Sequence, residues 1–408
     1  MNILKHAHVS RLYETLKHLR LSQILYRLKY RLDFWSAPSS LKNQTISPNW
    51  DANFDHLKEY QLAHPPSFQK SNLVKGEYEF IHIKEQINYP PNWDFRSPHK
   101  LWRYQLHYFD WLFCLDYQDA KKCVLNWIEL YSFKKSRDGW EAYPTSLRLI
   151  NWCIYFGAIH RIDLKNDSSF CRTLCKTIQI QTSWLERRLE YHLGVNHLFE
   201  NAAALAIIGC IFLGKDANRW RNRGLNLLNH EITEQILPDG MHCERSPMYH
   251  LRMFHVLNNV HLCFAAIGEN KWENVILSMQ KALNNILHPD EDIALFNDSN
   301  FGVYPLQNKK YLPKKIIEGS WQLPSAGYFG YRGSNGEYII VDAGAIGPDF
   351  NPGHAHGDIF SYELSWQNRR IIVDSGNFDY ESSDMRTYCR STKAHNTVDL
   401  DGKDQSDF

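Results

Sequence analysis

Apolar residues recur at helical spacing through most of the chain between about residues 93 and 287. Leu205, Ile208 and Phe212 illustrate the pattern, since side chains three or four positions apart share one face of an α-helix. Short polar breaks separate segments that run over 101–117, 120–131, 146–162, 170–189, 199–213, 220–236, 247–267 and 272–287. Successive helices joined by short loops predict antiparallel hairpins that stack as a bundle, a solenoid or a closed toroid.

After Asp298 the hydrophobic period changes to two, which is the spacing of β-strands. The expected strands cover 328–333, 336–342, 359–364, 370–373 and 395–400, and the first two flank Ser334 and Asn335 like the arms of a hairpin. Helices followed by about five antiparallel strands give an α+β fold class. Five strands do not close a sandwich comfortably, so we expect the second domain to be cut short at the C-terminus.

The first 32 residues also follow a helical pattern, in which basic residues alternate with leucines. They lack the apolar core and the cleavage site of a secretory signal peptide, which predicts a basic amphipathic helix and a cytoplasmic chain. No apolar run is long enough to span a bilayer. The expected division is 1–90 for this helix and a wrapping segment, 91–310 for the helical domain and 311–408 for the β domain.

The composition narrows the class of protein. A chain of 408 residues usually forms more than one domain, and 43% hydrophobic with 22% charged residues is ordinary for a globular protein. A net charge of +1 provides no global field that would attract nucleic acid or a membrane. The nine cysteines are an odd count without paired spacing, which favours free thiols. Aromatic residues make up 14%, which suits a groove that stacks on sugar rings or a large helical core.

Histidines and aspartates gather near the predicted strands. His354 and His356 lie two residues apart in Gly-His-Ala-His-Gly-Asp, Asp374 follows the next strand, and His395 opens the last expected strand. Imidazoles and a carboxylate from neighbouring strands are plausible zinc ligands. Hydrogen-bonded histidines at the ends of strands would give the same pattern without a metal.

Two loops in the helical part carry further chemistry-capable residues. The first is Gly-Val-Asn-His-Leu-Phe-Glu-Asn over 194–201, and it contains Asn196, His197 and Glu200. The second, over 238–250, contains Arg245 and Tyr249, and its Ser-Pro pair predicts a capped helix start. Taken one at a time, each of these residues is explained equally well by capping or packing.

Together with the Gly-His-Ala-His-x-Asp segment, these loops resemble the heparinase II/III-like polysaccharide lyases, a superfamily that also contains alginate and oligoalginate lyases. The resemblance covers about the last three-quarters of the chain and keeps the order of the motifs. It implies an (α/α) toroid followed by an antiparallel β-sandwich, an acidic polysaccharide as substrate, and a periplasmic location in place of a cytoplasmic one. The implied reaction is β-elimination, in which the C5 proton of a uronate is removed and the O4-linked sugar leaves.

The resemblance also implies roles for individual residues. Asn196 and His197 would neutralise the uronate carboxylate, and Tyr249 and His354 would exchange protons with C5 and O4. His356, Asp374 and His395 match a structural zinc site of some family members. The residues expected to bind the acidic sugar chain are Glu200, Arg245, Trp102, Tyr104, His107 and Arg148.

Two other functions fit the same residues. A zinc-dependent hydrolase would use a metal-bound water at His354, His356, Asp374 and His395. A non-catalytic sugar-binding protein of capsule or exopolysaccharide assembly would keep the scaffold without the reaction. The sequence does not discriminate among heparan sulfate, alginate and capsule polymers, or between endo and exo cleavage.

Overall fold

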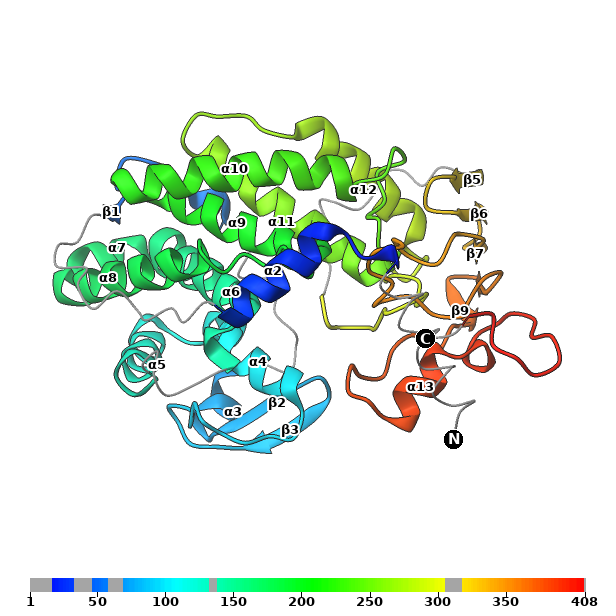
Figure 1. Ribbon diagram of the computed structural model, residues 1–408, viewed down its shortest axis with the longest axis horizontal. Coiled ribbons are helices and arrows are strands. Elements are labelled where there is room, and N and C mark those ends of the chain that lie inside the picture. The colour runs from blue at the N-terminus through cyan, green and yellow to red at the C-terminus, as the bar shows by residue number, and fades with distance from the viewer. Residues whose placement is uncertain (1–16, 33–45, 58–68, 132–137, 305–317, 407–408) are drawn as a thin grey trace.

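A layer of helices and a five-stranded β-sheet lie side by side in the computed structural model (Figure 1). The structure describes residues 17–32, 46–57, 69–131, 138–304 and 318–406. The first 16 residues of the expected N-terminal helix lie outside this range, and its described part is α2 (Leu21–Leu32). None of the helices in the described ranges is both long and apolar enough to cross a membrane.

The helical pattern between residues 93 and 287 is confirmed. The α-helices there are α4 (Lys100–Tyr108), α5 (Tyr117–Leu130), α6 (Ala142–Trp152), α7 (Arg161–Asn166), α8 (Ser168–Leu185), α9 (Val195–Ile211), α10 (Lys215–Gln235), α11 (Pro247–Ala265) and α12 (Glu273–Ile286). They form the helical toroid expected for this fold. Before them come α3 (Lys70–Val74), the hairpin of β2 (Glu77–Phe80) and β3 (Ile83–Gln86), and β1 (Ser47–Pro48), which pairs with β4 (Phe212–Leu213).

Helix α9 is the centre of the helical part. It packs against α6, α10 and α11, and it is buried along almost its whole length. Small residues allow α10 to approach it closely: a Cβ atom added to Gly224 would lie 2.5 Å from the backbone nitrogen of Ala206. A side chain at position 224 would therefore push the two helices apart.

Two predicted helices are interrupted in the structure. The segment expected over 101–117 leaves the helical conformation at Phe109, which has a left-handed φ of 61°, and continues as the 3-10 helix Asp110–Cys114. The segment expected over 146–162 begins earlier as α6 and then widens into the π-helix Cys153–Ile159. Hydrophobic periodicity did not reveal these changes, because apolar side chains stay buried in both segments.

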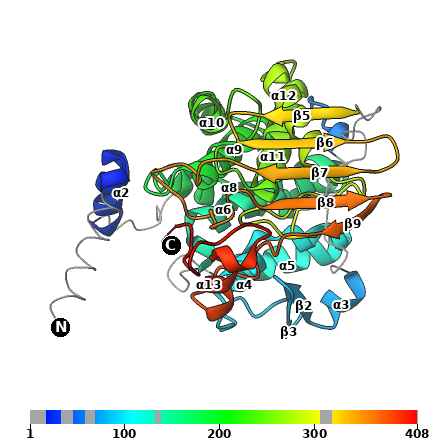
Figure 2. The ribbon, with the colours of Figure 1, turned by 90° about the vertical axis from the view of Figure 1, so that its right-hand side faces the viewer.

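The sheet contains five antiparallel strands in sequence order, β5 (Gly319–Leu323), β6 (Tyr328–Arg332), β7 (Tyr338–Asp342), β8 (Tyr362–Trp366) and β9 (Arg369–Ile372). Figure 2 shows one face of this sheet towards the viewer and the helices behind it. Tyr328, Tyr338 and Ile340 are buried on the side of the helices, whereas Phe329 and Tyr331 are exposed on the other side. Since one face of this sheet already packs on the helices, apolar residues on the other face are what packing against a second sheet would require.

One predicted strand is absent from the structure, and one observed strand was not predicted. Residues 395–400 do not form a strand; they follow the 3-10 helix Thr392–Ala394 and pair only through an isolated bridge at Leu400. The side-chain amide of Asn396 donates to the backbone oxygens of Tyr362 and Val373 at 3.1 and 3.0 Å, which replaces strand pairing. The missed strand is β5, whose exposed Ser320 and Gln322 weaken the apolar signal.

Candidate functional site

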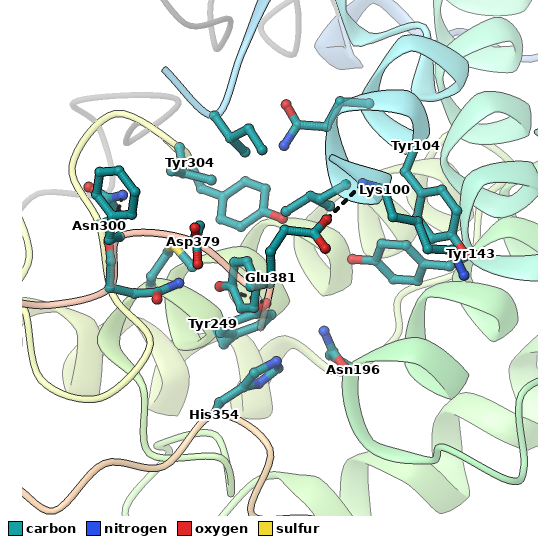
Figure 3. A pocket seen from close by; sticks show the side chains of 18 of the residues that line it. Lys100, Tyr104, Tyr143, Asn196, Tyr249, Asn300, Tyr304, His354, Asp379 and Glu381 are labelled. Atoms are coloured by element: carbon teal, nitrogen blue, oxygen red, sulfur yellow. Dashed lines mark hydrogen bonds between the residues drawn. The ribbon is translucent and has the colours of Figure 1, made fainter. Parts of the chain in front are cut away.

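Loops of the sheet face the helical part across a cavity of about 310 Å³. Figure 3 shows the cavity with Tyr249, His354 and Asn196 along one side and Glu381 projecting into its middle. The four residues predicted to be catalytic all line it, namely Asn196, His197, Tyr249 and His354. The cavity also has an aromatic wall of tyrosines, namely Tyr104, Tyr108, Tyr143, Tyr249, Tyr304 and Tyr380.

Two helix starts present side chains to this cavity. Asn196 lies in the first turn of α9, directly after Gly194, whose φ of 69° lets the chain turn sharply into the helix. Tyr249 lies in the first turn of α11. The backbone nitrogen of Tyr249 donates a hydrogen bond to the hydroxyl oxygen of Ser246 at 3.3 Å. The predicted Ser-Pro helix start is therefore confirmed. Helix N-termini carry partial positive charge, which favours a bound anion.

Tyr249, on a helix, contacts two residues that come from loops of the sheet domain, Tyr380 and His354. Its hydroxyl group donates to the hydroxyl oxygen of Tyr380 at 3.1 Å. Its ring stacks on the imidazole of His354, with 3.8 Å between the ring centroids and 14° between the planes. Burial raises the pKa of Tyr249 well above its ordinary value, and nearby Tyr380 adds to this effect. The phenol therefore holds its proton at neutral pH and can donate it.

A buried carboxylate holds His354 from behind. The Nδ1 atom of His354 lies 2.9 Å from Oε1 of Glu244, which is almost completely buried. Burial opposes a charge on His354, but the attraction and hydrogen bond of Glu244, with a further contribution from Asp298, raise the pKa of His354 above its ordinary value. Fixing Nδ1 in this way leaves Nε2 as the ring atom free to exchange a proton with a ligand.

Asn196 and His197 have polar atoms available for a ligand. Asn196 is only 3% exposed, and its Oδ1 atom has no hydrogen-bond partner among the described residues. The ring of His197 lies 4.4 Å from that of Tyr143, and its Nδ1 atom is 3.3 Å from Oε2 of Glu190. An unpaired polar atom in a buried amide is costly unless a ligand or a water molecule completes it.

Three of the residues expected to bind substrate lie inside the helical core. The indole of Trp102 donates to the backbone oxygen of Ile83 at 3.0 Å, and Trp102, His107 and Arg148 are all fully buried. Arg148 donates to the side chain of Gln181 at 2.8 Å, and burial lowers its pKa to about 9. These three side chains lie behind the wall of the cavity and are not among the residues that line it, in contrast to the expectation that they contact substrate. Tyr104 does line the cavity.

Glu200 and Arg245 are also absent from the lining of the cavity. Glu200 is fully buried and accepts a hydrogen bond from Nε of Arg252 at 2.6 Å. Arg245 has a left-handed φ of 54°, and its guanidinium group donates to the backbone oxygen of Gly347 at 2.8 Å. Both were expected to meet the sugar chain, and in the structure both connect parts of the protein to each other.

The predicted zinc ligands lie close together, but they pair with carboxylates. His354 and His356 precede β8 in a loop and do not project from a strand. The Nδ1 atom of His395 lies 2.9 and 3.0 Å from the two oxygens of Asp374, and Nε2 of His356 lies 2.8 Å from Oδ1 of Asp298. The rings of His356 and His395 are 5.3 Å apart.

The remaining ring nitrogens decide whether a metal fits these residues. Nδ1 of His356 and Nε2 of His395 are buried and have no hydrogen-bond partner in the described part of the chain. An imidazole that a carboxylate orients and whose other nitrogen is free has the chemistry of a metal ligand. No group of three His, Cys, Asp or Glu side chains within the described ranges is arranged to hold a metal ion, however. Zinc therefore stays a prediction.

Sequence reasoning did not single out several residues of the cavity. Tyr380, Asp379 and Glu381 all come from the loop after β9, and Lys100 comes from the start of α4. Oε1 of Glu381 accepts a hydrogen bond from the backbone nitrogen of Lys100 at 2.7 Å, so the sheet domain caps a helix of the other domain. The signal in the sequence was a run of polar and aromatic residues after Gly376, which has no periodic pattern.

Comparison with known proteins gives this geometry a family context. Residues 39–314 match the family model described as heparinase II/III N-terminus, and residues 317–408 match heparinase II/III-like, C-terminal. A heparin-sulfate lyase of Pedobacter heparinus is 28% identical over 46% of this chain and 33% of its own length. A heparin-sulfate lyase of Bacteroides thetaiotaomicron is 25% identical over 96% of this chain and 64% of its own length.

The fold is that of a solved structure from the same group. A crystal structure of heparinase III has a TM-score of 0.65 with 20% sequence identity, and the match covers 97% of this chain and 69% of that one. The chain spans about one third to two thirds of the length of the curated relatives that it matches. Since the two family models together cover most of its residues, the chain belongs to the heparinase II/III family.

Proposed function

We propose that this protein is a polysaccharide lyase that cleaves a uronic-acid-containing polymer by β-elimination. The observation that carries the proposal is the arrangement of Asn196, Tyr249 and His354 around one cavity with an aromatic wall. Aromatic rings are suited to stack on sugars, and the three polar groups supply what the elimination needs at its reacting centre. Relatives described as heparin-sulfate lyases support the same reaction class.

The elimination breaks the C5–H bond, and its electron pair forms a C4–C5 double bond as the C4–O4 bond breaks. The intermediate places negative charge on the uronate carboxylate, so hydrogen-bond donors must be held against that group. In this proposal the amide of Asn196, the imidazole of His197 and the positive N-terminal end of α9 take that role. Their shared place at one helix start lets them act on the two oxygens of a single carboxylate.

Proton transfer is assigned to Tyr249 and His354. Tyr249 gives its proton to O4 of the leaving sugar, because burial keeps the phenol protonated. When C5–H and O4 lie on opposite sides of the ring, the neutral imidazole of His354 takes the C5 proton while Tyr249 protonates O4. When they lie on the same side, Tyr249 has to react as the phenolate: it takes the C5 proton and then gives that same proton to O4. Glu244 positions His354 for either case by fixing its Nδ1 atom.

The charges of the cavity narrow the class of polymer. Among the described residues that line it there is no arginine, and the ammonium group of its single lysine, Lys100, lies 3.2 Å from Glu141. Asp379 and Glu381 add carboxylates to the same wall. Sulfate groups bind most strongly to arginine and free lysine side chains. We therefore propose a uronate polymer with few sulfate groups at the cleaved linkage.

A structural zinc ion remains part of the proposal. The free nitrogens of His356 and His395 are the atoms that would bind it, with Asp374 as a ligand or as the group that orients His395. A bound zinc would supply only a fixed charge that ties His356, in the loop before β8, to His395, which follows the 3-10 helix Thr392–Ala394. The proposed proton transfers use Tyr249 and His354 and do not involve the metal.

The test is to incubate the protein with unsulfated heparosan, heparan sulfate and alginate in water enriched in oxygen-18. Elimination gives a product with ultraviolet absorbance from the new double bond and no oxygen-18 in its new ends. A metal-dependent hydrolase would give saturated ends that carry the label, and a binding protein would retain the polymer without shortening it. Either of these last two results would reject the lyase proposal.

A further inference from the structure

Helix α2 presents a stripe of leucines to solvent. The exposed fractions of Leu21, Leu25, Leu28 and Leu32 are 79%, 64%, 53% and 75%. Their spacing of four, three and four residues places them on one line along an α-helix. Figure 2 shows α2 at the margin of the molecule, apart from the stacked helices and the sheet.

The opposite face of α2 fixes the helix to the rest of the protein. The ring of Tyr26 stacks on that of Tyr191, with 4.5 Å between the centroids. The side-chain amide of Gln23 is buried and donates to the backbone oxygens of His192 and Phe350 at 3.5 and 3.4 Å. Gln23 and Tyr26 point towards the rest of the protein, and the leucines lie on the opposite face of the helix. The contacts that hold α2 in place therefore also keep the leucine stripe exposed to solvent.

Basic residues flank the leucine stripe on both sides. With about 3.6 residues per turn, Arg27 and Arg31 fall between the stripe and the protein on one side, and Lys29 falls there on the other. All three are exposed, and the segment 17–32 contains no aspartate or glutamate. An apolar face flanked by basic residues is typical of amphipathic helices that lie in the interface of a membrane.

We propose that α2 docks this protein on the surface of a membrane that contains anionic lipids. The leucines would enter the boundary between headgroups and acyl chains, and the basic side chains would meet the lipid phosphates. A helix of 12 residues is about 18 Å long, which is too short to span a bilayer, so it lies parallel to the surface. The family models begin at residue 39, so nothing in the family match assigns a role to α2.

The charge of α2 favours lipid over a second copy of the chain. Pairing two leucine stripes would bring the arginines and lysines of both copies together, since the segment has no acidic residue to compensate them. An anionic lipid surface complements both the apolar stripe and its basic flanks. The proposal does not depend on the lyase reaction, because no residue of α2 lines the cavity.

The test is co-sedimentation of the full chain with vesicles of phosphatidylcholine alone or with one third phosphatidylglycerol. We expect at least tenfold stronger binding to the anionic vesicles, and that binding should weaken as salt is raised. Replacing Leu25 and Leu28 by serine should abolish it, and Arg27→Gln with Arg31→Gln should weaken it about tenfold. The matched control is Leu277→Ser, which changes a leucine of α12 that is 47% exposed and should leave binding unchanged.

Thermal unfolding checks that the serine variant keeps its fold, which is expected because its substitutions do not touch the face that packs. Equal binding to both kinds of vesicle, or unchanged binding of the serine variant, would overturn the proposal. Absence of binding to the anionic vesicles would also overturn it, and a dimer that the serine substitutions dissociate would then assign the stripe to self-association.

Discussion

Replacing Tyr249 by phenylalanine removes one hydroxyl group from the centre of the cavity and leaves the ring in place. The ring would still stack on His354, from which it is separated by 3.8 Å between centroids. The only change in bonding is the loss of the hydrogen bond between the hydroxyl groups of Tyr249 and Tyr380. The substitution therefore separates the chemistry of the phenol from its packing.

The expected magnitudes differ widely for activity and for stability. A general acid or base contributes about 10²–10⁴-fold to the rate, and a residue that serves as both should cost at least the upper part of that range. A loss of about 10³–10⁴-fold corresponds to about 4–5.5 kcal/mol of transition-state stabilisation. The lost hydrogen bond should change the free energy of unfolding by only about 1 kcal/mol.

The assay follows the ultraviolet absorbance of the unsaturated product at several substrate concentrations. For Tyr249→Phe we expect kcat to fall and KM to stay nearly constant, since the hydroxyl group acts on the transition state. The matched control is Tyr380→Phe, which removes the same hydrogen bond but keeps the Tyr249 hydroxyl group. Its effect should be much smaller.

Two results would refute this reasoning. If Tyr249→Phe keeps most of its activity, the phenol is neither acid nor base, and His354 or His197 becomes the candidate base. If Tyr380→Phe loses as much activity as Tyr249→Phe, the hydrogen bond matters more than the phenolic proton of Tyr249.

Three further predictions follow from other parts of the structure. Glu244→Gln removes the carboxylate that raises the pKa of His354, so the pH profile of kcat should shift to lower pH, and Glu244→Asp should restore it in part. Burial lowers the pKa of His242 to about 4 and that of His250 to about 3. Below about pH 6.5 the unfolded chain protonates both histidines, whereas the folded protein keeps them neutral. The free energy of unfolding should therefore fall as pH drops from 6.5 towards 4, by about 1.4 kcal/mol per pH unit for each histidine. Chemical denaturation at several pH values measures this change. For the zinc site, metal analysis should find one ion per chain, and dialysis against a chelator should lower the melting temperature. The variant His395→Ala should bind no zinc, and a chelator should not change its melting temperature.

The sequence predicted the helices well because their apolar faces are continuous and long. It failed where the chain departs from regular geometry, as at Phe109, where a single left-handed residue ends α4 inside an apolar run. The strand expected at 395–400 failed for a different reason, since the polar contacts of His395 and Asn396 bind that segment to β8 and its neighbours through side chains. Such contacts depend on tertiary placement, which no local pattern encodes.

The candidate site was predictable where a motif carried it. Tyr249 follows the Ser-Pro helix-start signal, whereas Asn196 was placed in a loop before a helix expected from residue 199 and lies in the first turn of α9; both line the cavity. Arg148 looked equally suitable from its charge, but it satisfies its hydrogen bonds inside the core with Gln181 and backbone groups. The sequence does not distinguish a buried arginine that supports the cavity through hydrogen bonds in the core from an exposed arginine that binds a ligand. In both cases the arginine lies in a helix that is rich in apolar residues.

The division of the cavity between two domains has a consequence for catalysis. Asn196 and Tyr249 are held by helices, whereas His354, Tyr380 and Glu381 come from loops of the sheet domain. Among the described residues, the Tyr249 ring, the proposed acid, is joined to the sheet domain by its stacking on His354 and its hydrogen bond to Tyr380. A shift of about 1 Å between the domains would separate the acid from its partners without unfolding either, and such misplacement can cost about 100-fold in rate. The hydrogen bond between Glu381 and the start of α4 joins the two domains at this cavity, so under the proposed mechanism we expect it to help keep the acid and its partners aligned.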